Sequence, residues 1–307
     1  MQTGSKGENL SGNYAVAVLQ REIFSRSSIV GFLVNKEITQ SYNDTEFTGY
    51  RYNRVAGLEY NFASTDNRWQ GKTFYHQSFY PGAGKDAAAF SGNIGYFSQY
   101  LKAAINQSWI GSDYIAEAGY IRRTGLYDIS PSVSYLFYPS RSERIISHGP
   151  GARLNAIFDP EFNLTDRETE LSYTIEWQNK SQLSVTVNEE FVQLGRDFDP
   201  TNTGGEKLAA GDQFHWKSAR TGFISDARKL FNYALNAGIG GYYNGNRWYV
   251  NGLINYRVQP YGSIGMAMNY NNISLPVPYN SAKLILVGPT LDITFTDKVF
   301  LSTFVQY

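Results

Sequence analysis

The sequence predicts an all-β fold, a transmembrane antiparallel up-and-down β-barrel of roughly 16 strands. Three observations lead to this prediction. Apolar and polar residues alternate along many segments, short turn sequences separate these segments, and almost none has the periodicity of a helix. Residues 225–231 fit one helical turn, but a strand that begins at Leu230 fits them equally well.

The clearest alternation lies in residues 170–178 and 182–190, on either side of a short turn at Asn179-Lys180-Ser181. In the first arm every second residue is apolar: Leu171, Tyr173, Ile175 and Trp177. Successive side chains of a strand point to opposite faces. Each arm is therefore expected to have an apolar face and a polar face.

The same alternation predicts strands along the rest of the chain, at 13–24, 28–39, 55–62, 69–79, 90–100, 101–111, 132–138, 230–243, 247–258, 263–270, 284–295 and 299–307. Asn244-Gly245 joins two of them and is typical of a tight hairpin. Polar stretches predict loops at 40–53, 80–87, 139–151 and 195–212. Pro289 falls inside a strand pattern, where it predicts a bulge or an edge strand.

Many consecutive hairpins fit either stacked soluble sheets or a membrane barrel. Strand length favours the barrel, because many predicted strands reach the ~9 to 11 residues that cross hydrocarbon at a tilt. The polar parities mix Gly, Ser, Asn, Gln, Thr and charges, as a watery lumen accepts. Aromatic residues recur toward strand ends, as at a membrane interface. A large soluble β-sandwich remains the alternative.

The composition excludes several classes of function. The chain has no cysteine, which removes disulfides and thiol chemistry. Its 27 Lys plus Arg balance 27 Asp plus Glu, so charge gives no reason to expect a nucleic-acid partner. No apolar run approaches the ~20 residues of a membrane helix. The first residues, MQTGSKGENLSG, lack the apolar core of a signal peptide.

Several segments resemble the outer-membrane barrel family called domain of unknown function 5916. They include VAVLQREIFSRSSIVGFLVNKE (16–37), STDNRWQGKTFYHQSF (64–79), EAGYIRRTGLYDISP (117–131), GGYYNGNRWYVNGLINYR (240–257) and DKVFLSTFVQY (297–307). The resemblance implies a Bacteroidota-type outer-membrane protein. In that family a carbohydrate-binding family 9-like domain usually precedes the barrel.

The resemblance also bears on the extent of the domain. The family usually has strands before the position that matches MQT and after the one that matches FVQY. Residues 1–307 are therefore expected to be a single barrel domain, truncated and open at both ends. The alternative is that Tyr307 is a genuine terminal aromatic.

Three groups of residues are candidate sites. Arg122 and Arg123 are the one paired basic spot in an otherwise uncharged run, and we expect them in the lumen or at the rim. The loop 195–212 carries Asp197, Asp199 and Asp212, a candidate weak cation site because Asp-x-Asp spacing can hold calcium. A solvated acidic loop is the alternative, since the full twelve-residue calcium loop is missing. The third group comprises aromatics that could stack on sugar rings or anchor an interface: Tyr243, Trp248 and Tyr249.

The expected function is non-enzymatic: porin-like passage or surface handling of a solute, with glycan-derived molecules as candidates. No cofactor motif is present, and the three His lack metal-ligand spacing. The expected partners are the lipid bilayer, a small solute and other outer-membrane proteins. One alternative is a membrane-embedded hydrolase, for which His148 beside Ser147 in SHGPG is the only hint. Another is a structural partner of a surface complex.

Overall fold

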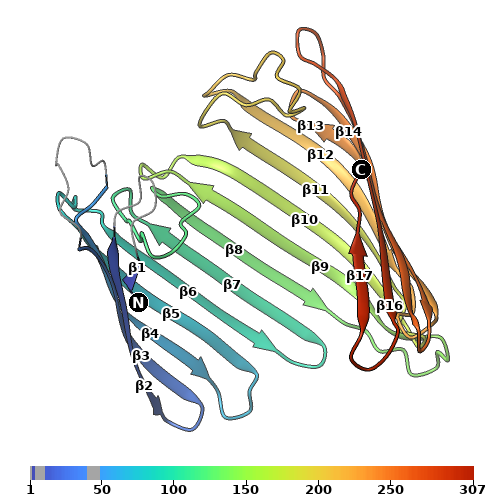
Figure 1. The fold of residues 1–307 in the computed structure, drawn as a ribbon, viewed down its shortest axis with the longest axis horizontal. Coiled ribbons are helices and arrows are strands. Elements are labelled where there is room, and N and C mark those ends of the chain that lie inside the picture. The colour runs from blue at the N-terminus through green and yellow to red at the C-terminus, as the bar shows by residue number, and fades with distance from the viewer. Residues whose placement is uncertain (1, 4–10, 40–48) are drawn as a thin grey trace. The chain divides into compact units, whose positions relative to one another are not determined.

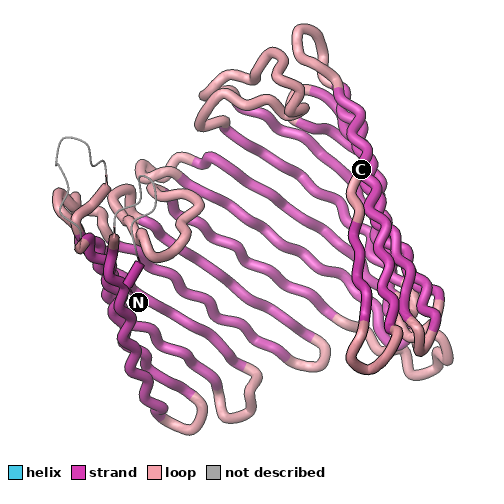
Figure 2. Tube along the Cα trace, viewed as in Figure 1, coloured by secondary structure: helices cyan, strands magenta, loops and turns pink. Residues whose placement is uncertain are grey.

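The computed structural model describes residues 2–3, 11–39 and 49–307, and these form strands and loops with no helix (Figures 1 and 2). The strands are β1 (Gln2–Thr3), β2 (Gly12–Ile23), β3 (Ser27–Ile38), β4 (Tyr52–Ala63), β5 (Trp69–Phe79), β6 (Ala88–Phe97), β7 (Leu101–Ile110), β8 (Leu126–Tyr135), β9 (Ile145–Phe158), β10 (Leu164–Trp177), β11 (Gln182–Gln193), β12 (Gln213–Ile224), β13 (Phe231–Tyr242), β14 (Gly245–Val258), β15 (Gly262–Ser274), β16 (Ala282–Thr294) and β17 (Phe300–Phe304).

Apart from the two-residue β1, the described strands number 16, are antiparallel and follow an up-and-down order, as the alternation predicted. The sheet order follows the chain order from β2 to β9 and from β10 to β17. Among the described residues no helix is long and apolar enough to cross a membrane. The barrel form and insertion into a membrane stay predictions.

The chain divides into two compact units. Unit 1 is Met1–Ser132 with Asn155–Leu164, and unit 2 is Val133–Leu154 with Thr165–Tyr307. Strands β8 and β9 each contribute residues to both. The expectation of a single domain over 1–307 stays a prediction.

In unit 1 the strand register gathers apolar side chains on one face. Leu58 of β4 lies opposite Tyr75 of β5, which lies opposite Phe90 of β6. We call this the apolar face of unit 1, and it also carries Ile94 and Ile105. The residues of the other parity, its polar face, include Glu59, Lys72, Ser91, Asn93 and Asn106.

The hydrophobic core of unit 1 lies on its polar face, beneath the loop 111–125. Tyr114 of this loop packs with Val55 and Ala89, and these three are surrounded by partly buried Phe32, Ile110, Ala116 and Ile121. The Asn53 side chain of β4 both donates a hydrogen bond to the backbone of this loop and accepts one from it. Its Nδ2 donates to the carbonyl of Ile115 at 2.9 Å, and its Oδ1 accepts from the Glu117 N–H at 3.0 Å.

In unit 2 the alternation predicted for 170–178 and 182–190 is confirmed in β10 and β11. Leu171 lies opposite Val187 and Tyr173 opposite Val185, while Ser172 of the other parity lies opposite Thr186. The apolar face of unit 2 continues onto Ala219 of β12, Ile239 of β13 and Trp248 of β14. Its polar face carries Glu170, Ser172, Thr186, Arg220 and Asn236.

Several local predictions are wrong. Residues 145–151 belong to β9 and not to a loop, and Tyr52 and Asn53 already belong to β4; residues 40–48 of the loop predicted at 40–53 lie outside the described residues. The ladder through Pro289 is continuous, with Met266 opposite, and β16 pairs on both sides, so Pro289 marks neither a bulge nor an edge. The hairpin at Asn244-Gly245 is confirmed, but its loop residues are Tyr243 and Asn244.

Gly245 has a different reason to be glycine. It already pairs with Tyr242 as the first residue of β14. A Cβ atom at this position would lie 2.2 Å from the carbonyl oxygen of Ser274 on β15. The glycine therefore allows two backbones to approach closely beside the turn.

Candidate functional site

The polar face of unit 2 is hollowed over β10 to β14. One pocket of about 420 Å³ is lined by Glu170, Ser172, Thr174, Ser184, Thr186, Arg220, Thr221, Gly222, Asn236, Tyr249 and Asn251. A second, of about 150 Å³, continues along the same face and shares Arg220 and Tyr249 with the first. We call the two together the polar groove.

Strand register explains why the groove is hollow. One row across the sheet runs Thr186, Arg220, Gly238 and Tyr249, from β11 to β14. The neighbouring row runs Asn188, Ser218, Gly240 and Arg247. Each row has a glycine on β13, between larger side chains on β12 and β14. The Tyr249 ring lies over Gly238, where a Cβ atom would come within 2.4 Å of it.

The two arginines of the groove are held by contacts to neighbouring side chains. Arg220 forms an ion pair with Glu170 across β11. Arg247 donates from Nη2 and Nε to the Oδ1 of Asn271, at 2.6 and 3.0 Å. Its guanidinium lies 4.8 Å from the ring centre of Tyr249 and 5.2 Å from that of Tyr242. These contacts hold both arginines in defined positions.

Two carbonyl oxygens in the groove have no hydrogen-bond partner among the described residues, the Oδ1 atoms of Asn188 and Asn251. Asn188 is only 5 % exposed. A buried polar atom without a partner costs about 1–3 kcal/mol. A ligand that donates a hydrogen bond to such an atom would remove this cost.

The three candidate aromatics do not form one stacking surface. Tyr249 lines the polar groove, whereas Trp248 lies on the apolar face, where its ring packs 4.7 Å from that of Tyr270. Tyr243 sits in the turn, 5.0 Å from the ring of Trp216 and 5.4 Å from that of Phe198. Burial raises the pKa of the Tyr243 hydroxyl to about 12. Adjacent residues of β14 are thus divided between opposite faces.

Arg122 and Arg123 lie in the loop 111–125, outside any strand, and both are exposed. Arg123 approaches the loop that follows β9. The pKa of the Asp159 carboxyl there is lowered, chiefly by a hydrogen bond from the Asn163 side chain, with a smaller contribution from the Arg123 charge. The pair therefore belongs to a loop of unit 1.

The three aspartates of the loop 195–212 are bound to backbone donors. Asp199 accepts hydrogen bonds from the N–H groups of Thr201, Thr203 and Gly204, at 2.8 to 2.9 Å. Asp197 accepts from the N–H of Ala210 at 3.0 Å, and Asp212 from that of Ala209 at 3.2 Å. In the described part of the chain, no three acidic, His or Cys residues are grouped as metal ligands would be. The structure thus gives these carboxylates a role in shaping the loop.

Asp199 has the most perturbed carboxylate of this loop. A hydrogen bond from the Thr201 hydroxyl, followed by those from the backbone N–H groups, lowers its pKa from 3.8 to about 2. Hydrogen bonds to the charged form favour that form. The carboxylate therefore closes the loop on itself at neutral pH.

His148 and Ser147 are consecutive residues of β9, so their side chains point to opposite faces. The His148 Nδ1 lies 2.6 Å from the hydroxyl of Tyr173 on β10. The sequence hint for a hydrolase was this neighbouring pair, and the strand separates its two members.

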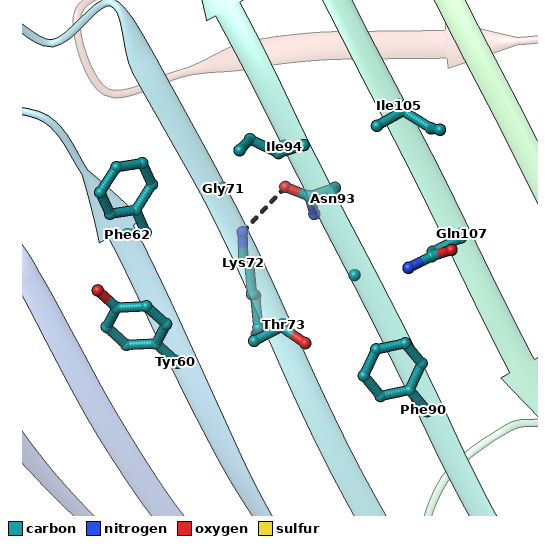
Figure 3. Close-up of a pocket in the computed structure, with 11 residues that line it drawn as sticks. Tyr60, Phe62, Gly71, Lys72, Thr73, Phe90, Asn93, Ile94, Ile105 and Gln107 are labelled. Carbon is teal, nitrogen blue, oxygen red and sulfur yellow. Dashed lines mark hydrogen bonds between the residues drawn. The ribbon is translucent and has the colours of Figure 1, made fainter.

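A second hollow lies on the apolar face of unit 1, with a volume of about 330 Å³. Figure 3 shows the side chains of Tyr60, Phe62, Phe90, Ile94 and Ile105 around it. It forms where Gly71 and Gly92 omit side chains. Gly71 admits no side chain, because a Cβ atom would lie 2.5 Å from the backbone oxygen of Asn93. The lining is mainly apolar, with Thr73 and Gln107 as its polar side chains on that face.

Sequence reasoning missed the groove residues that matter most here, Asn188, Arg220, Asn251 and Arg247. A partial signal existed, since Asn188 lies on the polar parity of 182–190. Comparisons with protein-family models, with curated proteins and with solved structures found no match to this chain. Fold and site together define an antiparallel all-β protein with one polar, hollowed face in unit 2.

Proposed function

We propose that this protein is a non-enzymatic outer-membrane β-barrel that passes or handles a small polar solute. The observation that carries the proposal is the two-sided character of unit 2. Its apolar face exposes Val185, Val187 and Ile239, at 48, 51 and 68 %. Its polar face holds a groove with one ion pair and two unpartnered amide oxygens.

Such a division suits a wall between lipid and water. Side chains of a membrane barrel alternate between a lipid-facing apolar set and a polar lumen. A sheet can face lipid only if its backbone groups are paired. Ladders join each neighbouring pair of strands from β10 to β16, and that between β12 and β13 covers Ser218–Ile224 of β12. The resemblance of several segments to the outer-membrane barrel family supports the same proposal.

The test measures the ionic conductance of a lipid bilayer that contains the protein. Purified protein is added to a planar lipid bilayer, and stepwise conductance is expected. Asn236→Trp, on the polar face of β13, should lower the size of each step. Ile239→Trp, on the apolar face of the same strand, is the matched control and should leave it unchanged.

Two outcomes would contradict the proposal. The absence of conductance steps, together with partner proteins that stay bound through purification, would favour a structural role in a surface complex. Full solubility without detergent, with a sharp monomer peak, would favour a soluble β-sandwich.

A further inference from the structure

We propose that the polar groove of unit 2 is a binding site for a neutral saccharide, held across β11 to β14. The inference deepens the proposed function and rests on it, in that it names the class of solute which the polar face handles. Three properties of the groove, its shape, its unpaired acceptors and its charge, support this ligand class.

The shape is that of an open trough. Gly222 of β12 and Gly240 of β13 line the groove without side chains of their own, while Glu170, Arg220 and Tyr249 rise around them. A pocket of about 420 Å³ followed by one of about 150 Å³ makes a site longer than one small ring. Pockets of this size take ligands of a few rings.

The two unpaired acceptor oxygens favour a ligand that donates hydrogen bonds. Asn188 and Asn251 each present a buried Oδ1 without a partner among the described residues. The Asn188 oxygen can be satisfied only by a donor, because an amide oxygen has no proton to give. A saccharide hydroxyl donates one hydrogen bond and accepts others, and so suits a site that mixes amide, hydroxyl and guanidinium groups.

Charge argues against an anionic ligand. The lining residues include three acids, Glu168, Glu170 and Glu190, against two bases, Arg220 and Arg247. Arg220 is paired with Glu170, and Arg247 is bound to Asn271. Three carboxylates against two guanidiniums give the lining an excess of negative charge, which disfavours an anion, and the carboxylates can accept bonds from hydroxyls.

Aromatic rings complete the site. Tyr249 lines both pockets, and Trp216 and Tyr242 line the smaller one. Rings with a polar edge bury apolar surface and still make hydrogen bonds. The C–H face of a sugar ring offers the matching apolar surface beside its hydroxyls.

The experiment measures saccharide binding by the purified protein in detergent micelles, by saturation-transfer NMR and titration calorimetry. The probes are four neutral linear trisaccharides, of glucose, mannose, galactose and N-acetylglucosamine. A galacturonic acid trisaccharide and a glucosamine trisaccharide are the anionic and cationic comparisons. At least one neutral probe should bind more tightly than both charged ones.

Variants test whether the saccharide binds in the groove. Asn188→Leu and Asn251→Leu should each raise the Kd about tenfold, the value of one good hydrogen bond. Asn269→Leu is the matched control, since Asn269 faces Asn251 on the same polar face but lines neither pocket. Its Kd should stay within about twofold. Circular dichroism checks that each variant keeps its strands.

The outcomes separate the two proposals. If the protein conducts but binds none of the neutral probes, or if Asn269→Leu weakens binding as much as Asn188→Leu, the saccharide site is wrong and the channel stands. If a neutral probe binds in the groove but bilayers show no conductance, the site stands and passage through the barrel is wrong. Tighter binding of the cationic probe would overturn the neutral ligand class.

Discussion

The loops 111–125 and 195–212 follow a strand of unit 1 and a strand of unit 2, and they are held in opposite ways. The loop 111–125 is held by strand side chains. Asn53 bonds to it in both directions, and Lys36 of β3 reaches its Glu117 at 3.1 Å. The loop 195–212 is held mainly by itself, through Asp199 and through a backbone bridge between Phe198 and Leu208.

The difference concerns how each loop lies on the polar face of its own unit. In unit 1 the loop lies on the strands and buries Tyr114 against Val55. In unit 2 the loop makes its outside contacts with other connections, by the Phe198 ring on Tyr243 and by a bond from Asn280 to Thr203. Because this loop pairs its own polar groups internally, its structure does not depend on hydrogen bonds to the strands of the sheet. Residues 195–212 accordingly do not line the polar groove of unit 2.

The largest effect is expected from freeing the loop of unit 1. Tyr114→Ala removes a buried ring, 7 % exposed, and should destabilise the packing of the loop by about 3–5 kcal/mol. Trypsin cleavage at Arg122 and Arg123 should then become faster, because cleavage follows local opening. Tyr120→Ala, in the same loop but 89 % exposed, should change neither the packing of the loop nor the rate of trypsin cleavage. Equal cleavage of the two variants would show that Tyr114 does not hold the loop.

A smaller effect should separate the two faces of unit 2. Val185→Arg, on the apolar face, should lower the free energy of unfolding in lipid vesicles by about 2–4 kcal/mol. Thr174→Arg, on the polar face of β10, should be tolerated far better. Thr186 is a poorer control, because it is only 5 % exposed. Urea titration measures both variants, and similar losses would mean that neither face of unit 2 meets lipid.

The smallest effect concerns acid and the loop 195–212. The folded loop lowers the pKa of Asp199 from 3.8 to about 2, so the carboxylate stabilises the loop fully above about pH 4. This stabilisation should be lost as the pH falls from about 4 to 2. Hydrogen exchange of the Thr203 and Gly204 amides, corrected for intrinsic rates, should show protection that disappears over this range.

The control for this effect is Asp199→Ala, whose amides should exchange rapidly at every pH. Protection that persists unchanged down to pH 2 in the natural chain would show that the carboxylate does not close the loop.

Alternation could predict most of the strands, and interruptions of it explain the failures. Residues 69–79 match β5 at both ends. The pattern missed β9 because Gly149-Pro150-Gly151 breaks it, and such residues are depleted in strands. It also missed β12, where Phe214 and Trp216 share the polar parity with Ser218.

The groove was less accessible to prediction. The polar parity of Asn188 could be read from the chain, but its missing partner could not. That depends on Ser218 and Gly240, which strand register places in the same row from two other strands. Register between β11, β12 and β13 follows from loops and pairing over the whole sheet, and no local pattern contains it.

The division of Trp248 and Tyr249 between opposite faces constrains how this chain can change length. Deleting one residue early in β14 would move each following side chain to the opposite face of the sheet. Tyr249 would then leave the groove, and its neighbours would exchange environments. Deleting two would shorten the strand and keep every later residue on its own side. Natural relatives of this chain are therefore expected to differ inside strands by even numbers of residues, and to confine odd changes to their loops.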